Sequence, residues 1–181
     1  MTRMNLVDPA SATPAVQPTL DQIKGVFGVV PNMFKAVANS PAALSSMWSA
    51  FGALGGGTIG SRLGEQIAVA IANRNACQYC LAVHTVLGQK AGASAADMAA
   101  AQIGQSSDPR TSAALQFALK IVESRGQASA EDVKALRAAG FDDGAIVEII
   151  AHVALNLFTN YINVALDVPV DFPSVKLRHA A

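Results

Sequence analysis

Residues 75–84, NACQYCLAVH, contain the two cysteines of the chain, Cys77 and Cys80, and a histidine, His84. Helical positions three or four apart share a face, with Cβ atoms roughly 5–6 Å apart, so the three side chains are expected on one side of a helix. Cysteines at this spacing can form a disulfide after a small adjustment. The closed loop is very short, so the bond adds little stability. A bond that forms easily and stabilises little is typical of a reversible redox couple.

The same segment can supply a thiolate, which is the reactive form of cysteine. Cys77 is expected in the first helical turn, where the macrodipole favours negative charge. His84 can accept a proton from a nearby thiol or stabilise the thiolate as an imidazolium. Glu65 lies on the preceding predicted helix, among apolar neighbours. A helix hairpin would bring Glu65 back beside the cysteines, where it could orient His84 and take part in a proton relay.

Three other roles of the cysteines compete with a redox pair: a buried apolar side chain, a zinc site and covalent haem attachment. Either cysteine could be a small buried hydrophobe. The two cysteines, with His84 and Glu65, could bind zinc, but structural zinc sites usually draw ligands from separated segments, and the chain has no second CxxC and no HxxxH. Covalent haem needs a histidine directly after the second cysteine, and Leu81 stands there. We therefore favour a redox pair and expect no metal and no cofactor.

The composition limits the classes of function. The chain has 181 residues, which indicates one domain or two tightly joined lobes. Hydrophobic residues make up 51% of the chain and charged residues 14%, and the formal net charge is zero. A nucleic-acid backbone needs clustered Lys and Arg, so no nucleic-acid partner is expected. The apolar, alanine-rich composition instead suggests buried helix faces and an oligomer interface.

The sequence also predicts a location. No uninterrupted apolar run reaches the roughly 18 residues of a membrane span, so no membrane partner is expected. The beginning of the chain, MTRMNLVDPASATPAVQ, lacks the apolar core of a secretory signal. A cytoplasmic protein is therefore expected. Thiols are kept reduced there, so a close cysteine pair is more often catalytic, redox-active or metal-binding than a structural disulfide.

Helix start and stop signals place the elements that must position these side chains. Residues 1–17 are rich in Pro, Ala, Ser and Thr and are expected to form an N-terminal arm, followed by one helical domain over 18–181. A helix carrying the cysteines is expected to end at Gly92, and a long apolar helix is expected over about 143–166. Other helices are expected to begin at the capping residues Ser40, Ser61, Ser94, Asp108 and Ser129, and Asp142 is expected to cap the last helix. No alternating β pattern of useful length occurs, so the fold class is predicted to be all-α.

A weak internal repeat is possible. Aligning Glu65 with Glu148 places Asn160 and Asn163 at the positions of the two cysteines. Either the fold contains two related helix hairpins, of which only the first keeps the chemistry, or the similarity is a chance match between alanine-rich helices.

Polar and aromatic residues elsewhere have ordinary structural interpretations. His152, on the long apolar helix, is expected to be a satisfied structural histidine rather than a catalytic one. The asparagines of the same helix are expected to make helix–helix hydrogen bonds, with lining of the site as the alternative: Asn156, Asn160 and Asn163. A cluster in an earlier helix is expected to be core or subunit interface: Met47, Trp48 and Phe51.

The spacing of Glu65, Cys77, Cys80 and His84 resembles that of the AhpD-like alkylhydroperoxidases, which belong to the carboxymuconolactone decarboxylase superfamily. The similarity extends beyond the motif. The segment GVVPNMFKAVANSPAAL, residues 28–44, resembles the amino-terminal segment of the peroxidase-related branch. Residues 140–171, GFDDGAIVEIIAHVALNLFTNYINVALDVPVD, resemble the family's carboxy-terminal helix, so the likeness covers about residues 18–171.

This resemblance implies an all-helical AhpD-like fold assembled as a homo-oligomer, from a dimer or trimer up to a hexamer. It also implies reduction of organic hydroperoxides, with Cys80 as the peroxidatic thiol, Cys77 as the resolving thiol, and Glu65 and His84 as a proton relay. An external dithiol or another thiol–disulfide reductant would then reduce the pair. One departure concerns the residue before the second cysteine, where well-studied members carry a histidine and this chain has Tyr79. Tyrosine is no base near neutral pH, so the relay would be simpler or the rate lower.

The two lines of reasoning differ on the attacking thiol. The helix dipole favours Cys77, whereas the family pattern and the spacing to His84 favour Cys80, and we take Cys80 because a base one turn away is the stronger perturbation. Two other functions compete with a peroxidase. One is a redox-sensing or partner-binding module without significant turnover, and the other is a lactone decarboxylase, although decarboxylating members lack the cysteine pair.

Overall fold

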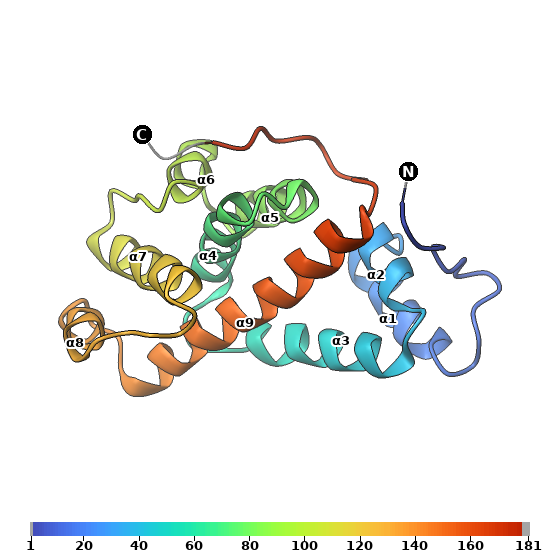
Figure 1. Ribbon diagram of the computed structural model, residues 1–181, viewed down its shortest axis with the longest axis horizontal. Helices are drawn as coiled ribbons and strands as arrows, with labels where there is room; N and C mark the ends of the chain where they lie inside the picture. Colours follow the sequence, from blue (N-terminus) through green and yellow to red (C-terminus); the bar gives the residue numbers. More distant parts are fainter. Residues whose placement is uncertain (1, 179–181) are drawn as a thin grey trace.

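The computed structural model describes residues 2–178, and over this range the chain forms helices and no strand, which confirms the predicted all-α fold. The helices are α1 (Gln17–Phe27), α2 (Asn32–Val37), α3 (Pro41–Gly55), α4 (Ser61–Arg74), α5 (Gln78–Lys90), α6 (Ala95–Ala101), α7 (Pro109–Glu123), α8 (Ala130–Ala138) and α9 (Asp143–Leu166) (Figure 1).

Helix α4 is the centre of the molecule. It contacts α5, α6, α7 and α9, and the run from Gln66 to Ala72 is buried throughout. A helix that is apolar on nearly all sides must be enclosed by others. Figure 1 shows α9 crossing the molecule diagonally, with α4 and α5 on one side of it and α3 on the other, while α7 and α8 lie at one end and α1 and α2 at the opposite end.

The capping signals are confirmed at most helix starts. Side chains of Ser40, Asp108 and Asp142 accept backbone hydrogen bonds at the starts of α3, α7 and α9. Capping boxes form at Ser94 and Ser129, where a serine and the aspartate three residues later bond reciprocally. The prediction at Ser61 was wrong by one position, because Gly60 is the N-cap of α4 and Ser61 is its first residue.

Helix α9 does not contain the second hairpin that the possible repeat required. The segment aligned with the break between α4 and α5 lies inside one uninterrupted helix. Among residues 2–178, α9 is also the one helix long and apolar enough to cross a membrane by length and composition. Its inner residues, among them Ile149 and Val153, are buried, and α9 contacts α2, α3, α4, α5, α7 and α8. These contacts are those of a core helix.

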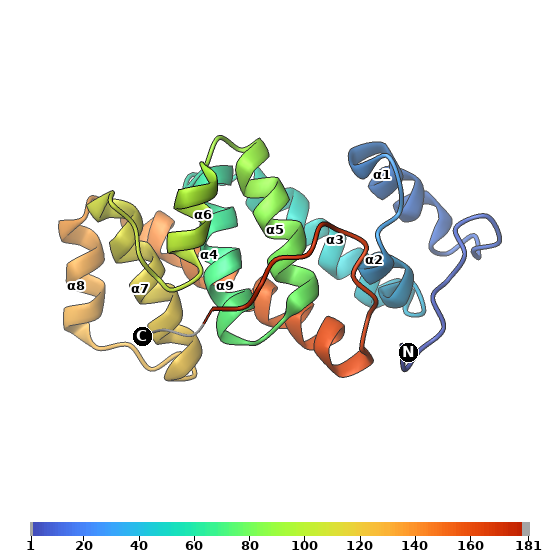
Figure 2. The same ribbon diagram turned by 90° about the horizontal axis from the view of Figure 1, so that it is seen from above.

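Both ends of the described chain lie along the helices. Near the beginning, the backbone N–H of Arg3 donates to the carbonyl of Leu166, and that of Val7 donates to Lys35. The segment after α9, residues 168–178, has no helix and passes over α5 toward α6, as Figure 2 shows from above. Asn32 donates to the carboxylate of Asp171, and Asn73 and Arg178 exchange two hydrogen bonds, so this C-terminal segment is tied down at both of its ends.

Candidate active site

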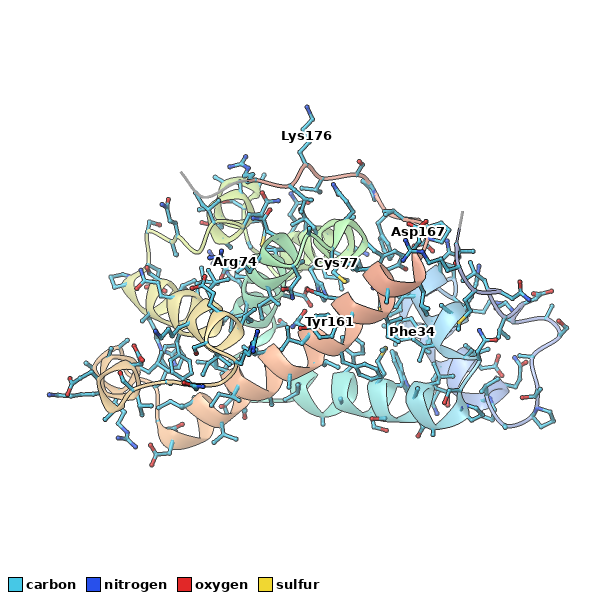
Figure 3. The ribbon with its side chains drawn as sticks, viewed as in Figure 1. Phe34, Arg74, Cys77, Tyr161, Asp167 and Lys176 are labelled. Carbon is cyan, nitrogen blue, oxygen red and sulfur yellow. The ribbon has the colours of Figure 1, made fainter. Side chains whose placement is uncertain are left out.

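The two cysteines lie at the junction between α4 and α5. Ala76 takes a left-handed backbone conformation, with φ of 53°, and this turns the chain sharply after α4. The turn makes Cys77 the N-cap of α5 rather than a first-turn residue, which corrects the sequence prediction. Its Sγ accepts the backbone N–H of Cys80 at 3.2 Å. Figure 3 shows Cys77 at this junction, between α5 and α9.

Cys80 is the better stabilised thiolate of the pair. Its Sγ accepts a hydrogen bond from Nδ2 of Asn163 at 3.2 Å, and the thiol of Cys77 also hydrogen-bonds to it. Burial raises the pKa of Cys80, but the hydrogen bond from Cys77, the charge of His84 and the bond from Asn163 together lower this pKa to about 7. The hydrogen bond to Cys80 and burial raise the pKa of Cys77. Cys77 is therefore the proton donor and Cys80 the acceptor.

Glu65 and His84 form a partly buried pair beside the thiols, as the hairpin argument predicted. The distance from His84 Nδ1 to Glu65 Oε2 is 2.7 Å. Burial lowers the pKa of His84, but the carboxylate of Glu65 and the thiol of Cys80 outweigh burial, and the pKa is raised. The Nδ1–H that bonds Glu65 leaves Nε2 of His84 as the nitrogen that can exchange a proton elsewhere.

An apolar pocket of about 320 Å³ opens beside Cys80. Cys80, His84 and Glu65 form part of its wall, whereas Cys77 does not. Six aromatic residues contribute to the remaining wall, from α1, α2, α3, α5 and the C-terminal segment: Phe27, Phe34, Trp48, Phe51, Tyr79 and Phe172. Phe34 packs edge-on against both Trp48 and Phe51, with ring centroids 5.7 and 6.0 Å apart. Such packing fixes the ring positions, so the pocket is preformed.

Tyr79 has a structural place in this pocket. Its hydroxyl accepts the backbone N–H of Met33 at 3.2 Å, and its ring meets the ring of Phe172 edge-on, with centroids 5.9 Å apart. Burial raises the pKa of Tyr79, so the phenol stays neutral. Tyr79 therefore joins α5 to α2 and to the C-terminal segment, and it supplies no base.

The asparagines of α9 divide between the two expected roles. Asn163 contacts Cys80 directly, which is the alternative that sequence reasoning ranked second. Asn160 accepts from Nδ2 of Asn75 at 3.0 Å, and its side chain also bonds Cys80 and lowers the pKa of that thiol, so it has both roles. Asn156 donates to the carbonyl of His152, which is a structural bond.

His152 and Glu148 lie on the other side of the Glu65–His84 pair. Nε2 of His152 is buried and has no hydrogen-bond partner, so the prediction of a satisfied structural histidine was wrong for this atom. Oε2 of Glu148 accepts from the backbone N–H groups of Thr58 and Ile59 and from the Thr58 hydroxyl. Glu148 therefore fastens the connection between α3 and α4 to α9.

Sequence reasoning predicted that the four motif residues lie together, but it missed the walls around them. Glu65, Cys77, Cys80 and His84 lie together, from two adjacent helices. Met47 lies in the core as predicted, and Trp48 and Phe51 pack against the core and also line the pocket with Phe34 and Phe172. The aromatic residues of the pocket come from five segments and have no common spacing, so no sequence signal could have grouped them. Over residues 2–178, no group of three or more His, Cys, Asp or Glu side chains could hold a metal ion.

The helices and the site together define an all-α protein with a buried dithiol, backed by a histidine–carboxylate pair. Residues 41–124 match the model of the carboxymuconolactone decarboxylase family. The chain thus contains a domain of this family with an AhpD-like fold. No curated protein matches the chain.

Solved structures of similar fold cover nearly the whole chain. An uncharacterized peroxidase-related protein from Silicibacter sp. TM1040 has a TM-score of 0.82 and 23% identity, covering 93% of this chain and 91% of its own. An uncharacterized peroxidase-related protein with an alkylhydroperoxidase AhpD core, from Ralstonia eutropha JMP134, has a TM-score of 0.81 and 25% identity. The match covers 94% of this chain and 92% of that protein. The debrominase Bmp8 in complex with 2,3,4-tribromopyrrole has a TM-score of 0.80 and 20% identity. The match covers 94% of this chain and 92% of that protein.

Proposed function

We propose that this protein is a thiol-dependent peroxidase that reduces organic hydroperoxides at Cys80, with Cys77 as the resolving thiol. One observation carries the proposal: Cys80 is part of the wall of an apolar pocket, accepts a hydrogen bond from Asn163, and lies beside the bonded His84–Glu65 pair. A thiolate, a proton donor and an apolar binding space therefore meet at one sulfur.

The chemistry balances with the residues present. The Cys80 thiolate attacks the nearer peroxide oxygen, the O–O bond breaks, and the leaving alkoxide takes a proton from Nε2 of the His84 imidazolium and departs as an alcohol. Cys80 is then a sulfenic acid. The Cys77 thiol attacks its sulfur, a disulfide forms, and the hydroxyl leaves as water. The net change consumes one hydroperoxide and two thiols and yields an alcohol, water and one disulfide.

An external reductant must then return two electrons. Both cysteines are only 1% exposed, so a dithiol has to be small or the surrounding segments have to open. A reducing cytoplasm would supply such a dithiol, which is the location that we propose.

Cysteine substitutions test the proposal. Cys80→Ser should abolish consumption of cumene hydroperoxide in the presence of dithiothreitol, because the attacking sulfur is gone. Cys77→Ser should let a sulfenic acid accumulate, detected as a dimedone adduct by mass spectrometry, because no thiol resolves it. Circular dichroism controls for folding. Unchanged turnover in Cys80→Ser, or a single oxidation of the wild type without repeated turnover, would reject a peroxidase, and the latter result would favour the redox-sensing module.

Reductive removal of bromide from a brominated aromatic ring is a second candidate. The observation that favours it is the aromatic wall of the 320 Å³ pocket, together with the structural likeness to the debrominase Bmp8. The two thiols would supply two electrons, the ring would gain a proton at the carbon that loses bromide, and the cysteines would end as a disulfide. Bromide release from tribromopyrrole, measured by ion chromatography beside peroxide consumption, decides between the two substrates.

A further inference from the structure

A second cavity lies behind the Glu65–His84 pair. It has a volume of about 90 Å³, and both members of the pair border it as well as the apolar pocket. The pair thus separates the two spaces. On the far side the cavity is bordered by Gly55, Gly60 and Ser61, which are exposed residues at the connection between α3 and α4. The cavity therefore extends from the pair toward solvent.

Two polar residues of α9, His152 and Asn156, border this cavity. The ring packs directly on Gly64, where a Cβ would come within 3.0 Å of Cε1. Because Gly64 has no side chain, the His152 ring has room beside α4. The ring lies one turn along α9 from Glu148. Nε2 of the ring is buried without a partner. An unsatisfied buried nitrogen is costly, so it calls for a water or another polar group.

The cavity meets the requirements of bound water. One water needs about 10–15 Å³ and two to four polar partners. The cavity is larger, and five side chains on its border carry polar atoms: Ser61, Glu65, His84, His152 and Asn156.

We propose that His152 is a positioning residue of the proton relay: a water route in this cavity joins its ring to Glu65 and holds the carboxylate against Nδ1–H of His84, so that Nε2 of the imidazolium keeps the proton for the alkoxide. The charged and titratable groups around the ring are Glu65 on α4, His84 on α5 and Glu148 on α9 itself. Helix α3 and its connection to α4 contribute apolar residues and Ser61 to the cavity. Burial lowers the pKa of His152, so the ring is neutral at pH 7, with one nitrogen as donor and the other as acceptor.

The water route from His152 to Glu65 rests on the proposed peroxidase function, and two reactions of the same sulfur test the two separately. Oxidation of Cys80 by cumene hydroperoxide expels an alkoxide, which needs a proton. Alkylation of Cys80 by iodoacetamide expels iodide, which needs none. In Cys77→Ser protein, His152→Phe should slow the single-turnover oxidation about tenfold or more at pH 7, and it should change the alkylation rate less than about twofold. His152→Gln, which keeps a polar group in the cavity, should recover part of the loss.

A matched control is Gln102→Leu, which removes another buried polar atom without a hydrogen-bond partner, at the end of α6, where the residue borders a different cavity. It should leave both rates unchanged. Equal slowing of oxidation and alkylation in His152→Phe, or no slowing of either, would overturn the route.

An independent measurement applies even if the wild type does not reduce peroxides. The pKa of the His84 ring, measured by NMR titration, should change in His152→Phe and stay the same in Gln102→Leu. Only His152→Phe breaks the water link to Glu65. No shift in His152→Phe would overturn the route, whereas a shift in a protein without peroxidase activity would reject the peroxidase and keep the link.

Discussion

At the level of single residues, Cys80 owes its lowered pKa to groups from separate parts of the chain. Asn163 comes from α9, Cys77 from the junction before α5, and His84 from one turn further along α5. Each contributes a hydrogen bond or a positive charge that favours the thiolate against the cost of burial. The reactivity of Cys80 with an alkylating reagent should therefore respond to changes at each of them.

Asn163→Ala should raise the pKa of Cys80, because the Nδ2 hydrogen bond to Sγ at 3.2 Å favours the charged form. Thiolate increases as the pH rises through the Cys80 pKa of about 7, so the midpoint of the alkylation profile should move to higher pH. Below the midpoint, each pKa unit lowers the thiolate fraction about tenfold. We expect a loss of about two- to tenfold at pH 6, measured with iodoacetamide in Cys77→Ser protein. Gln116→Ala, on the exposed side of α7, is the control, and an unchanged midpoint in Asn163→Ala would contradict the assigned hydrogen bond.

Glu65→Gln should lower the pKa of His84, because the carboxylate that holds the imidazolium is removed. His84 then loses its proton at lower pH, so at pH 7 it no longer stabilises the Cys80 thiolate or protonates the alkoxide. Peroxide reduction at pH 7 should fall by about 10²-fold, the usual effect of losing a general acid. NMR titration of the His84 ring gives the pKa directly, and a ring that titrates as in the wild type would contradict the pairing.

At the level of elements, helix ends rather than helix interiors shape the site. The start of α5 is capped by a thiol, and the end of α4 turns through Ala76 in a left-handed conformation. Ser94 and Ser129 could be predicted as caps because a capping box is a local pattern of four residues. Helices α1 and α2 were not individually predicted, because α2 has only six residues and neither of the two has a side-chain cap.

Ala76→Gly should stabilise the protein, because an L-residue with φ of 53° is strained and glycine is not. The strain of about 1–2 kcal/mol is partly offset by the extra chain entropy of glycine, about 0.5–1 kcal/mol, so the net gain is about 0.5–1 kcal/mol. Ala91→Gly is a matched control, since Ala91 ends α5 with φ of −79° and has no such strain to relieve. Urea denaturation should show a higher midpoint for Ala76→Gly only. A lower midpoint would mean that the turn does not have this conformation.

At the level of the whole molecule, α9 leaves one apolar face uncovered. Val147, Ile150, Tyr161 and Val164 are 65, 40, 62 and 49% exposed, and Ala154 and Leu157 complete a 3-4-3-4-3 spacing between them. Figure 3 shows Tyr161 on α9, away from the C-terminal segment. This α9 outer face has the spacing of a helix–helix seam, which two identical helices can share about a two-fold axis. We propose that a second copy of the chain packs on it in a homo-oligomer.

A double substitution, Val147→Glu with Tyr161→Glu, should dissociate this oligomer, because two buried charges would face their own copies across the axis. Light scattering after size-exclusion chromatography should show a smaller mass for the double variant than for the wild type. Lys134→Glu, on the exposed face of α8, is the control and should keep the wild-type mass. A monomeric wild type would reject the proposal.

The sequence alone determined the fold class, most helix starts and the four motif residues, because caps and i, i+3, i+4 spacings act over a few residues and survive any packing. It also placed Glu65 beside His84, since two consecutive helices joined by a short turn return on each other. Only the tertiary structure showed that Cys77 caps α5, that Asn163 of α9 bonds Cys80, and that aromatic residues of distant segments enclose the pocket. The bond from Asn163 to Cys80 joins residues 83 positions apart, and the packing of α9 across α4 and α5, not any local pattern, sets which side chains meet.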